Sequence, residues 1–141
     1  MTTARDMMHA GVQCIGEHET LDKAARMMDE LGVGALPICG DDDRLHGIIT
    51  DRDIVIKCLA KGGDARTMTA SELAQGKPMT VEADSDLHAV LRMMSEHQIK
   101  RMPVIDQHRL VGMISESDLA RHLSEQDLAE FVEAVYARSG G

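Results

Sequence analysis

Residues 47–53 read Gly47-Ile48-Ile49-Thr50-Asp51-Arg52-Asp53, and this stretch decides the fold. Two β-branched apolar residues that run into Thr-x-x-Asp predict a buried strand passing directly into a helix. Residues 112–118 repeat the pattern as Gly112-Met113-Ile114-Ser115-Glu116-Ser117-Asp118. A pattern that recurs at a fixed spacing identifies a structural unit that the chain contains twice.

The repeat extends over most of the chain. An offset of 66 residues relates Pro37 to Pro103 and Leu21 to Leu87, and it falls to 65 between Gly47 and Gly112 because the second turn is one residue shorter. Each copy is expected to form a small mixed sheet with both helices on one face. The predicted fold class is α+β (mixed α/β), with two tandem β-α-β-β-α motifs and a C-terminal helix. The expected boundaries are motif 1 at 6–63, a connector at 64–68, motif 2 at 69–123 and the last helix at 124–137.

Hydroxyl and carboxylate side chains three residues apart predict where helices begin, because both can satisfy free amides of the first turn. These pairs are Thr3/Asp6, Thr50/Asp53, Thr69/Glu72, Ser115/Asp118 and Ser124/Asp127, and Thr20 is a further cap. A first strand is expected at 12–15. A hairpin is expected from strands at 35–39 and 45–49 joined by a turn at 40–43.

Apolar residues at helical spacing predict the buried faces of three helices. The predicted faces are Leu21, Ala24, Ala25, Met28 and Leu31 in the first, Ile54, Val55, Cys58 and Leu59 in the second, and Leu128, Phe131, Val132 and Val135 in the last.

The composition excludes several partners. The net charge is −9, and no Lys/Arg cluster is interleaved with aromatic residues, so a nucleic-acid polymer or an anionic membrane surface is not expected as a partner. No apolar run approaches the ~20 residues of a membrane span. The first residues lead into no apolar signal segment, so a cytoplasmic location is expected.

The motifs resemble a tandem pair of CBS domains, a Bateman module, and the chain is similar to the mycobacterial hypoxic response protein group of small CBS proteins. The residues that carry the resemblance are Gly34-Ala35-Leu36-Pro37-Ile38 and Leu45 to Ile54 in one copy, and Arg101 to Asp106 and Arg109 to Leu119 in the other. The resemblance implies two motifs packed around a pseudo-twofold axis and a homodimer. It also implies two clefts for AMP, ATP, NAD or S-adenosylmethionine.

The resemblance nominates residues for each cleft. In the family pattern, the Thr or Ser that opens the last helix contacts phosphate or ribose, and the Asp three residues later contacts ribose hydroxyls. The first cleft is assigned Cys14, Val33, Gly34, Thr50 and Asp53, and the second Thr80, Ile99, Lys100, Arg101, Ser115 and Asp118. Helix capping alone also explains Thr50/Asp53 and Ser115/Asp118. Lys100 and Arg101 are either phosphate ligands or solvated cations.

The cysteines and histidines raise two further questions. Cys14 and Cys39 are placed at the ends of two strands of one small sheet, where a disulfide between them is one hypothesis and two reduced thiols the other. Cys58 is expected in the core. The seven histidines show no metal-binding spacing, so no metal site is predicted.

Two functions follow as hypotheses. The first is a regulatory module in which a nucleotide shifts the packing of the motifs and so changes a surface for an unknown protein partner. The second is a ligand-free dimeric scaffold, linked to a redox or stress response, that acts through the dimer face and the helix around Phe131. No catalytic residue set is recognised, so the chain is not expected to be an enzyme, and no cofactor is required.

Overall fold

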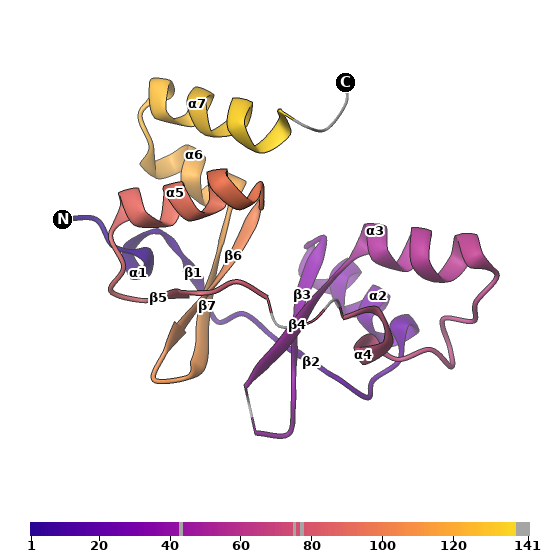
Figure 1. Cartoon of the computed structure of the whole chain (residues 1–141). Coiled ribbons are helices and arrows are strands. Elements are labelled where there is room, and N and C mark those ends of the chain that lie inside the picture. Colours follow the sequence, from indigo (N-terminus) through magenta and orange to yellow (C-terminus); the bar gives the residue numbers. More distant parts are fainter. Residues whose placement is uncertain (43, 75, 77, 138–141) are drawn as a thin grey trace. The chain divides into compact units, whose positions relative to one another are not determined.

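The computed structural model describes residues 1–42, 44–74, 76 and 78–137. The chain divides into two compact units (Figure 1). The central unit comprises Gln13–Pro78, and the split unit comprises Met1–Val12 together with Met79–Gly141. In the described part of the chain, no helix combines the length and the apolar character that crossing a bilayer requires.

The central unit contains a three-stranded sheet in the order β2-β3-β4. β2 (Ile15–Gly16) runs parallel to β3 (Ala35–Cys39), and β3 pairs antiparallel with β4 (Leu45–Thr50). The helical segments are α2 (Leu21–Leu31), α3 (Asp51–Asp53), the π-helical turn η1 (Ile54–Cys58), the 3₁₀ turn η2 (Leu59–Lys61) and α4 (Ala70–Leu73). The expected hairpin is confirmed, while residue 43 of its turn lies outside the described residues.

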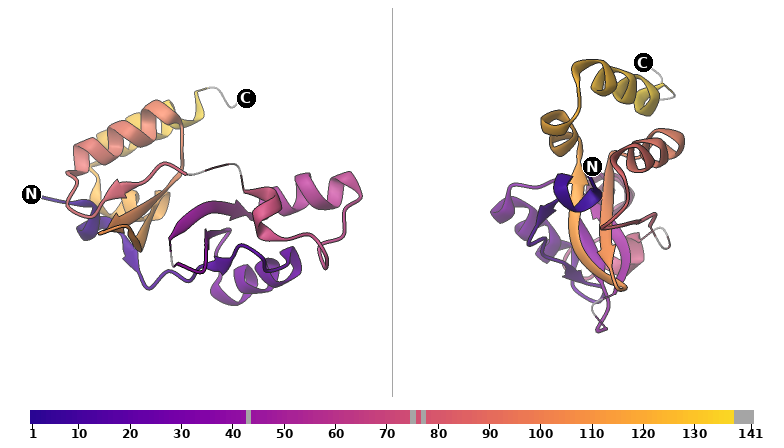
Figure 2. Two further views of the ribbon diagram at one scale, coloured as in Figure 1. Left: turned by 60° about the horizontal axis from the view of Figure 1, so that its bottom comes forward. Right: turned by 90° about the vertical axis from the view of Figure 1, so that its left-hand side faces the viewer.

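The split unit contains a four-stranded sheet in the order β1-β7-β6-β5. Its strands are β1 (His9–Ala10), β5 (Val81–Glu82), β6 (Arg101–Asp106) and β7 (Arg109–Ser115). Its helices are α1 (Ala4–Met7), α5 (Leu87–His97), α6 (Glu116–His122) and α7 (Glu125–Tyr136). α7 lies beside α5, so the C-terminal helix packs on its own unit (Figures 1 and 2).

The predicted capping residues all cap their helices. Thr3, Thr50, Thr69 and Ser115 each form a reciprocal capping box with the carboxylate three residues later. Thr20 and Ser124 accept a hydrogen bond from the third amide of their helices. These bonds satisfy amide groups that have no partner within the helix, and they explain why strands β4 and β7 turn directly into helices.

The short leading helices are exchanged between the two sequence motifs. α1 lies at the start of motif 1, yet it belongs to the split unit, where its first two amides donate to the carbonyls of Ser85 and Ala83 at 2.8 and 2.9 Å. α4 lies at the start of motif 2, yet it belongs to the central unit, where its first two amides donate to the carbonyls of Glu19 and Glu17 at 2.8 and 2.9 Å. The compact units therefore follow a different division of the chain from the repeat boundaries at 6–63 and 69–123.

The exchange explains the glycine that opens each repeated stretch. A Cβ on Gly47 would lie 2.9 Å from the Cβ of Ala74, and one on Gly112 would meet the Met8 side chain and lie 2.9 Å from the carbonyl oxygen of His9. Both glycines are buried, and the segment after the exchanged helix crosses directly over each of them. Only a residue without a side chain permits that approach.

The cores contain many of the predicted residues, with several corrections. Ala25 is exposed, Leu31 is 41% exposed and Val132 is 41% exposed, although each was expected on a buried face. Val55 and Leu59 are 52% and 56% exposed. Each of these helices buries only a narrow stripe of its surface against its neighbour, and these side chains lie outside that stripe.

The first strand was placed incorrectly. It was expected at 12–15, but β2 comprises Ile15–Gly16, so Cys14 precedes the strand instead of ending it. β1 at His9–Ala10 was not expected. Both differences have one cause, because residues 1–12 belong to the split unit, where His9 and Ala10 pair with β7 of the other motif.

The exchange predicts a specific sensitivity at Gly112. A Gly112→Ala substitution is expected to lower the free energy of unfolding by about 1–3 kcal/mol, because the added methyl group displaces β1 or Met8. Urea denaturation measures the change. Gly16→Ala is the matched control, since its Cβ would meet only the flexible Glu19 side chain at 3.3 Å. Equal stability of the Gly112→Ala variant and the wild type would contradict the close approach.

Candidate ligand-binding site

A pocket of about 260 Å³ opens in the split unit where β6 begins and β7 ends. It is lined by Lys100, Arg101, Ser115, Glu116 and Ser117. The antiparallel register pairs Arg101 with Ser115, which brings the residues before β6 beside the first residues of α6. Three of the six residues nominated for the second cleft thus meet at one pocket.

The other three residues nominated for the second cleft are not among the residues that line this pocket. Asp118 is 3% exposed. Ile99 packs partly buried against the split-unit core, and Thr80 is partly buried just before β5. Glu116 and Ser117, which do line the pocket, were not nominated from the sequence. Glu116 and Ser117 directly follow Ser115 in the first turn of the same predicted helix. Their position in that turn could therefore have identified them as pocket residues.

The carboxylate of Asp118 is engaged within the protein. Its Oδ2 accepts the Ser115 amide at 2.8 Å and the Ser115 hydroxyl at 2.9 Å, and it lies 2.8 Å from Nδ1 of His9. Burial opposes ionisation, but the Ser115 amide, His9 and the Ser115 hydroxyl together hold the pKa of Asp118 below its usual value. Asp118 therefore fixes the helix start and ties it to β1, and His9 is a partner that sequence reasoning missed.

Tyr136, the last residue of α7, contacts two residues of the pocket. The Nζ of Lys100 lies 4.3 Å from the centre of the Tyr136 ring. The Tyr136 hydroxyl donates to Oε1 of Glu116 at 2.9 Å. A single Tyr in the chain carries no periodic signal, so the sequence did not predict these contacts.

The first-cleft residues are arranged in the same way in the central unit. Thr50 pairs with Ala35 across the hairpin, and the Asp51 amide donates to the carbonyl of Gly34 at 2.9 Å. This places Gly34 beside Thr50, and Val33 is 40% exposed at the same end of the sheet. The nominated backbone positions are therefore equivalent in the two motifs.

Asp53, like Asp118, lies beside a nitrogen-bearing side chain. Its Oδ2 accepts the Thr50 amide at 3.0 Å, and its Oδ1 lies 3.0 Å from Nζ of Lys57. Burial raises the pKa of Asp53, but Lys57 and the Thr50 amide and hydroxyl lower it by more. The pKa of Asp53 therefore lies below its usual value.

Cys14 and Cys39 are joined by a disulfide in the structure, with their Cα atoms 5.7 Å apart. The parallel register pairs Gly16 with Cys39, which brings Cys14 close to the end of β3. Cys14 is thus bound to another residue of the central unit. Cys58 is a free, buried thiol, as expected.

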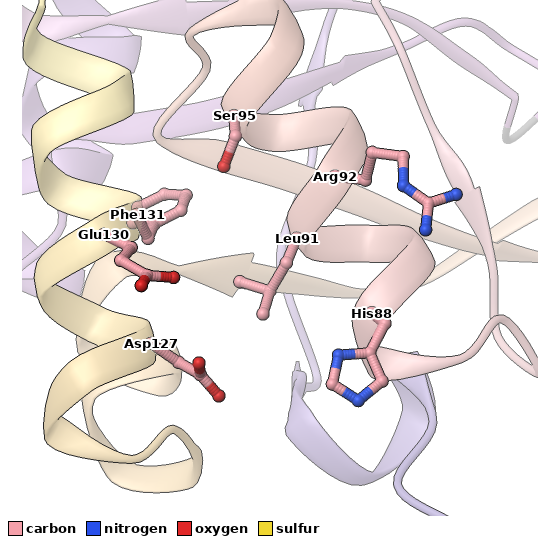
Figure 3. A pocket seen from close by; sticks show the side chains of 7 residues that line it. All are labelled: His88, Leu91, Arg92, Ser95, Asp127, Glu130 and Phe131. Carbon is pink, nitrogen blue, oxygen red and sulfur yellow. The ribbon is translucent and has the colours of Figure 1, made fainter.

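A second pocket, also of about 260 Å³, lies between α5 and α7 (Figure 3). Figure 3 shows Asp127 and Glu130 directed from α7 toward α5, while Arg92 points away from α7. Its lining comprises His88, Leu91, Arg92, Ser95, Asp127, Glu130 and Phe131. Acidic and apolar groups dominate between the helices, so this pocket suits a phosphate less well than the pocket at Lys100.

Both repeats match the CBS domain family model, over residues 4–59 and 70–125. The chain belongs to the CBS-domain family. Hypoxic response protein 1 of Mycobacterium tuberculosis is 58% identical over 135 residues, which cover 96% of this chain and 94% of that protein. The CBS domain-containing protein YhcV of Bacillus subtilis is 36% identical, over 80% of this chain and 79% of that protein.

A crystal structure of Hypoxic Response Protein I with two coordinated zinc ions has the same fold. It aligns with a TM-score of 0.80 and 60% identity, and the match covers 87% of this chain and 100% of that chain. In this CBS pair, the described residues form no group of three or more His, Cys, Asp or Glu side chains that could hold a metal ion. Pairs of such side chains do occur, for example His46 and Glu17 at 3.3 Å, but they do not form a metal site of this kind.

The lowered pKa of Asp118 determines how this residue makes the stability of the protein depend on pH. Because the pKa of Asp118 is lower in the folded than in the unfolded protein, its contribution is present above about pH 4 and is lost as the pH falls below that value. Asp118→Asn is expected to lower the free energy of unfolding near neutral pH by about 1–3 kcal/mol and to make the acid-induced loss shallower. Urea denaturation at several pH values measures both effects.

The exposed Asp29→Asn substitution in α2 is the control for this experiment. It is expected to leave the pH dependence unchanged. An acid profile that is the same in the wild type and in Asp118→Asn would show that Asp118 does not stabilise the folded state through its charge.

Proposed function

We propose that this CBS pair is a regulatory protein that binds an adenine-containing nucleotide, with the phosphate in the pocket beside Lys100. The observation that carries the proposal is the convergence of Lys100 and Arg101 with the Ser117 hydroxyl around one opening, where the Ser115 hydroxyl can join them by turning from Asp118 to the ligand. Ammonium, guanidinium and hydroxyl groups are the donors that proteins use for phosphate oxygens. The volume lies near the lower end of small-molecule pockets, which suits a ribose phosphate.

The charge of the pocket orders the candidate ligands. AMP, ATP and NAD carry phosphates that complement Lys100 and Arg101, whereas S-adenosylmethionine carries a cationic sulfonium. The protein as a whole is acidic, with a net charge of −9, so these two cations, partly offset by the Glu116 carboxylate, provide a local attraction within an unfavourable overall field. We infer a signalling role without catalysis, in which the bound ligand favours one conformation over another.

A second candidate function is a dimeric interaction scaffold. Val55, Ile56 and Leu59 are 52%, 42% and 56% exposed on consecutive turns of the central unit, and exposed apolar clusters of this kind mark protein contacts. We propose this surface as the homodimer contact. Phe131 is 3% exposed within the split-unit core, so its own side chain does not form such a contact, and a contact through other residues of α7 stays a prediction.

The disulfide adds a redox element to the second candidate. Closing a loop with a sequence separation of 25 residues stabilises the central unit by about 3 kcal/mol in the chain-entropy model. Reduction would loosen that unit.

The cytoplasmic location stays a prediction, and cell fractionation tests it.

Calorimetric titration with AMP, ATP, NAD and S-adenosylmethionine tests the nucleotide proposal. Binding of a phosphate-bearing ligand is expected, and Arg101→Ala is expected to weaken it about ten- to a hundredfold through the loss of a charged hydrogen bond. Arg109→Ala, an exposed cation on β7, is the matched control and should retain wild-type affinity. No heat with any of the four ligands, or equal loss in both variants, would remove the proposal.

Light scattering after size exclusion tests the dimer surface. Leu59→Glu is expected to shift a wild-type dimer to a monomer, because a carboxylate would be buried in an apolar contact. The neighbouring Lys61→Glu changes charge without removing apolar surface and should leave the dimer intact. A monomeric wild type, or a dimeric Leu59→Glu variant, would exclude this surface.

A further inference from the structure

Tyr136 connects the C-terminal helix to the candidate site. Its ring lies under the ammonium of Lys100, with 4.3 Å from Nζ to the ring centre, and its hydroxyl donates to Glu116 at 2.9 Å. Lys100 precedes β6 and Glu116 begins α6, and both line the pocket. One side chain from a third element therefore engages two pocket residues of opposite charge.

The body of α7 is firmly held, so the position of Tyr136 is defined by packing. Phe131 and Val135 are each 3% exposed in the split-unit core. The Gln98 side chain donates to the carbonyl of Ala134 at 3.3 Å. Tyr136 itself is 38% exposed, so its contacts with the pocket can open without unfolding the helix.

A phosphate in the pocket competes with both contacts of Tyr136. A phosphate is a stronger partner for the Lys100 ammonium than the face of an aromatic ring. The same phosphate repels the Glu116 carboxylate, which is the acceptor for the Tyr136 hydroxyl. Ligand binding and the Tyr136 contacts therefore oppose each other at the same two residues.

We infer that Tyr136 is a latch whose release is coupled to anion binding at the pocket, an inference that rests on the proposed function. With the pocket free, Tyr136 holds Lys100 and Glu116. With a phosphate bound, Lys100 turns to the ligand, Tyr136 is released, and the end of α7 changes its surface. The end of α7 is therefore the element through which a partner would sense whether the pocket is occupied.

The latch makes a directional prediction that a ligand contact would not make. Because releasing Tyr136 opposes binding, Tyr136→Leu is expected to tighten the binding of AMP and of ribose 5-phosphate about two- to fivefold. Tyr136→Phe keeps the ring over Lys100 and removes only the hydroxyl, so a smaller gain is expected. Calorimetry measures the affinities, and circular dichroism confirms that both variants fold.

The wild-type protein also provides its own reporter, since the chain has one Tyr and no Trp. Ribose 5-phosphate does not absorb where tyrosine does, so titration with it should change the fluorescence of Tyr136 with the calorimetric midpoint. Arg101→Ala should shift that midpoint to higher concentration, and Arg109→Ala should not. The fluorescence change then follows occupancy of this pocket.

The outcomes separate the two proposals. If neither AMP nor ribose 5-phosphate binds by calorimetry, the proposed function fails and the latch fails with it. If they bind and Tyr136→Leu has unchanged or weaker affinity, the latch alone is overturned. Tighter binding by Tyr136→Leu together with a saturating fluorescence change in the wild type supports it.

Discussion

The reciprocal hydrogen bonds between Ser115 and Asp118 are the interaction on which the candidate site depends. They end β7 and begin α6 within one residue, and this sharp transition places the hydroxyls of Ser115 and Ser117 opposite Arg101. The same carboxylate holds His9, so the N-terminal segment is joined to the site through one buried group. The pocket thus depends on a single local arrangement, which Thr50 and Asp53 repeat in the other motif.

The two motifs share this arrangement and differ in what surrounds it. Asp53 is paired with Lys57 one helical turn away, whereas Asp118 is paired with His9, which lies far away along the chain but in a strand of the same sheet unit. The first motif contains the disulfide between Cys14 and Cys39, at the last residue of β3, whereas the second carries Lys100 and Arg101, where β6 begins, close to Tyr136. A duplicated unit has therefore acquired different chemistry in its two copies.

Local features of the fold were predictable from the sequence, whereas partners distant along the chain were not. The capping pairs and the hairpin depend on residues within a few positions of one another, so their spacing sufficed. The exchange of α1 and α4 was missed because a repeat does not tell which copy a leading segment joins. Lys100, Arg101 and Ser115 followed from the family pattern, while Tyr136 and His9 carry no pattern and are recognised only from their contacts.

A crystal structure of the protein grown with AMP would show directly whether the pocket beside Lys100 holds the phosphate. We expect a phosphate within hydrogen-bonding distance of Lys100 or Arg101 and of Ser115, with the Tyr136 ring no longer over Lys100. Density for AMP elsewhere, with this pocket empty and Tyr136 still bonded to Glu116, would contradict it.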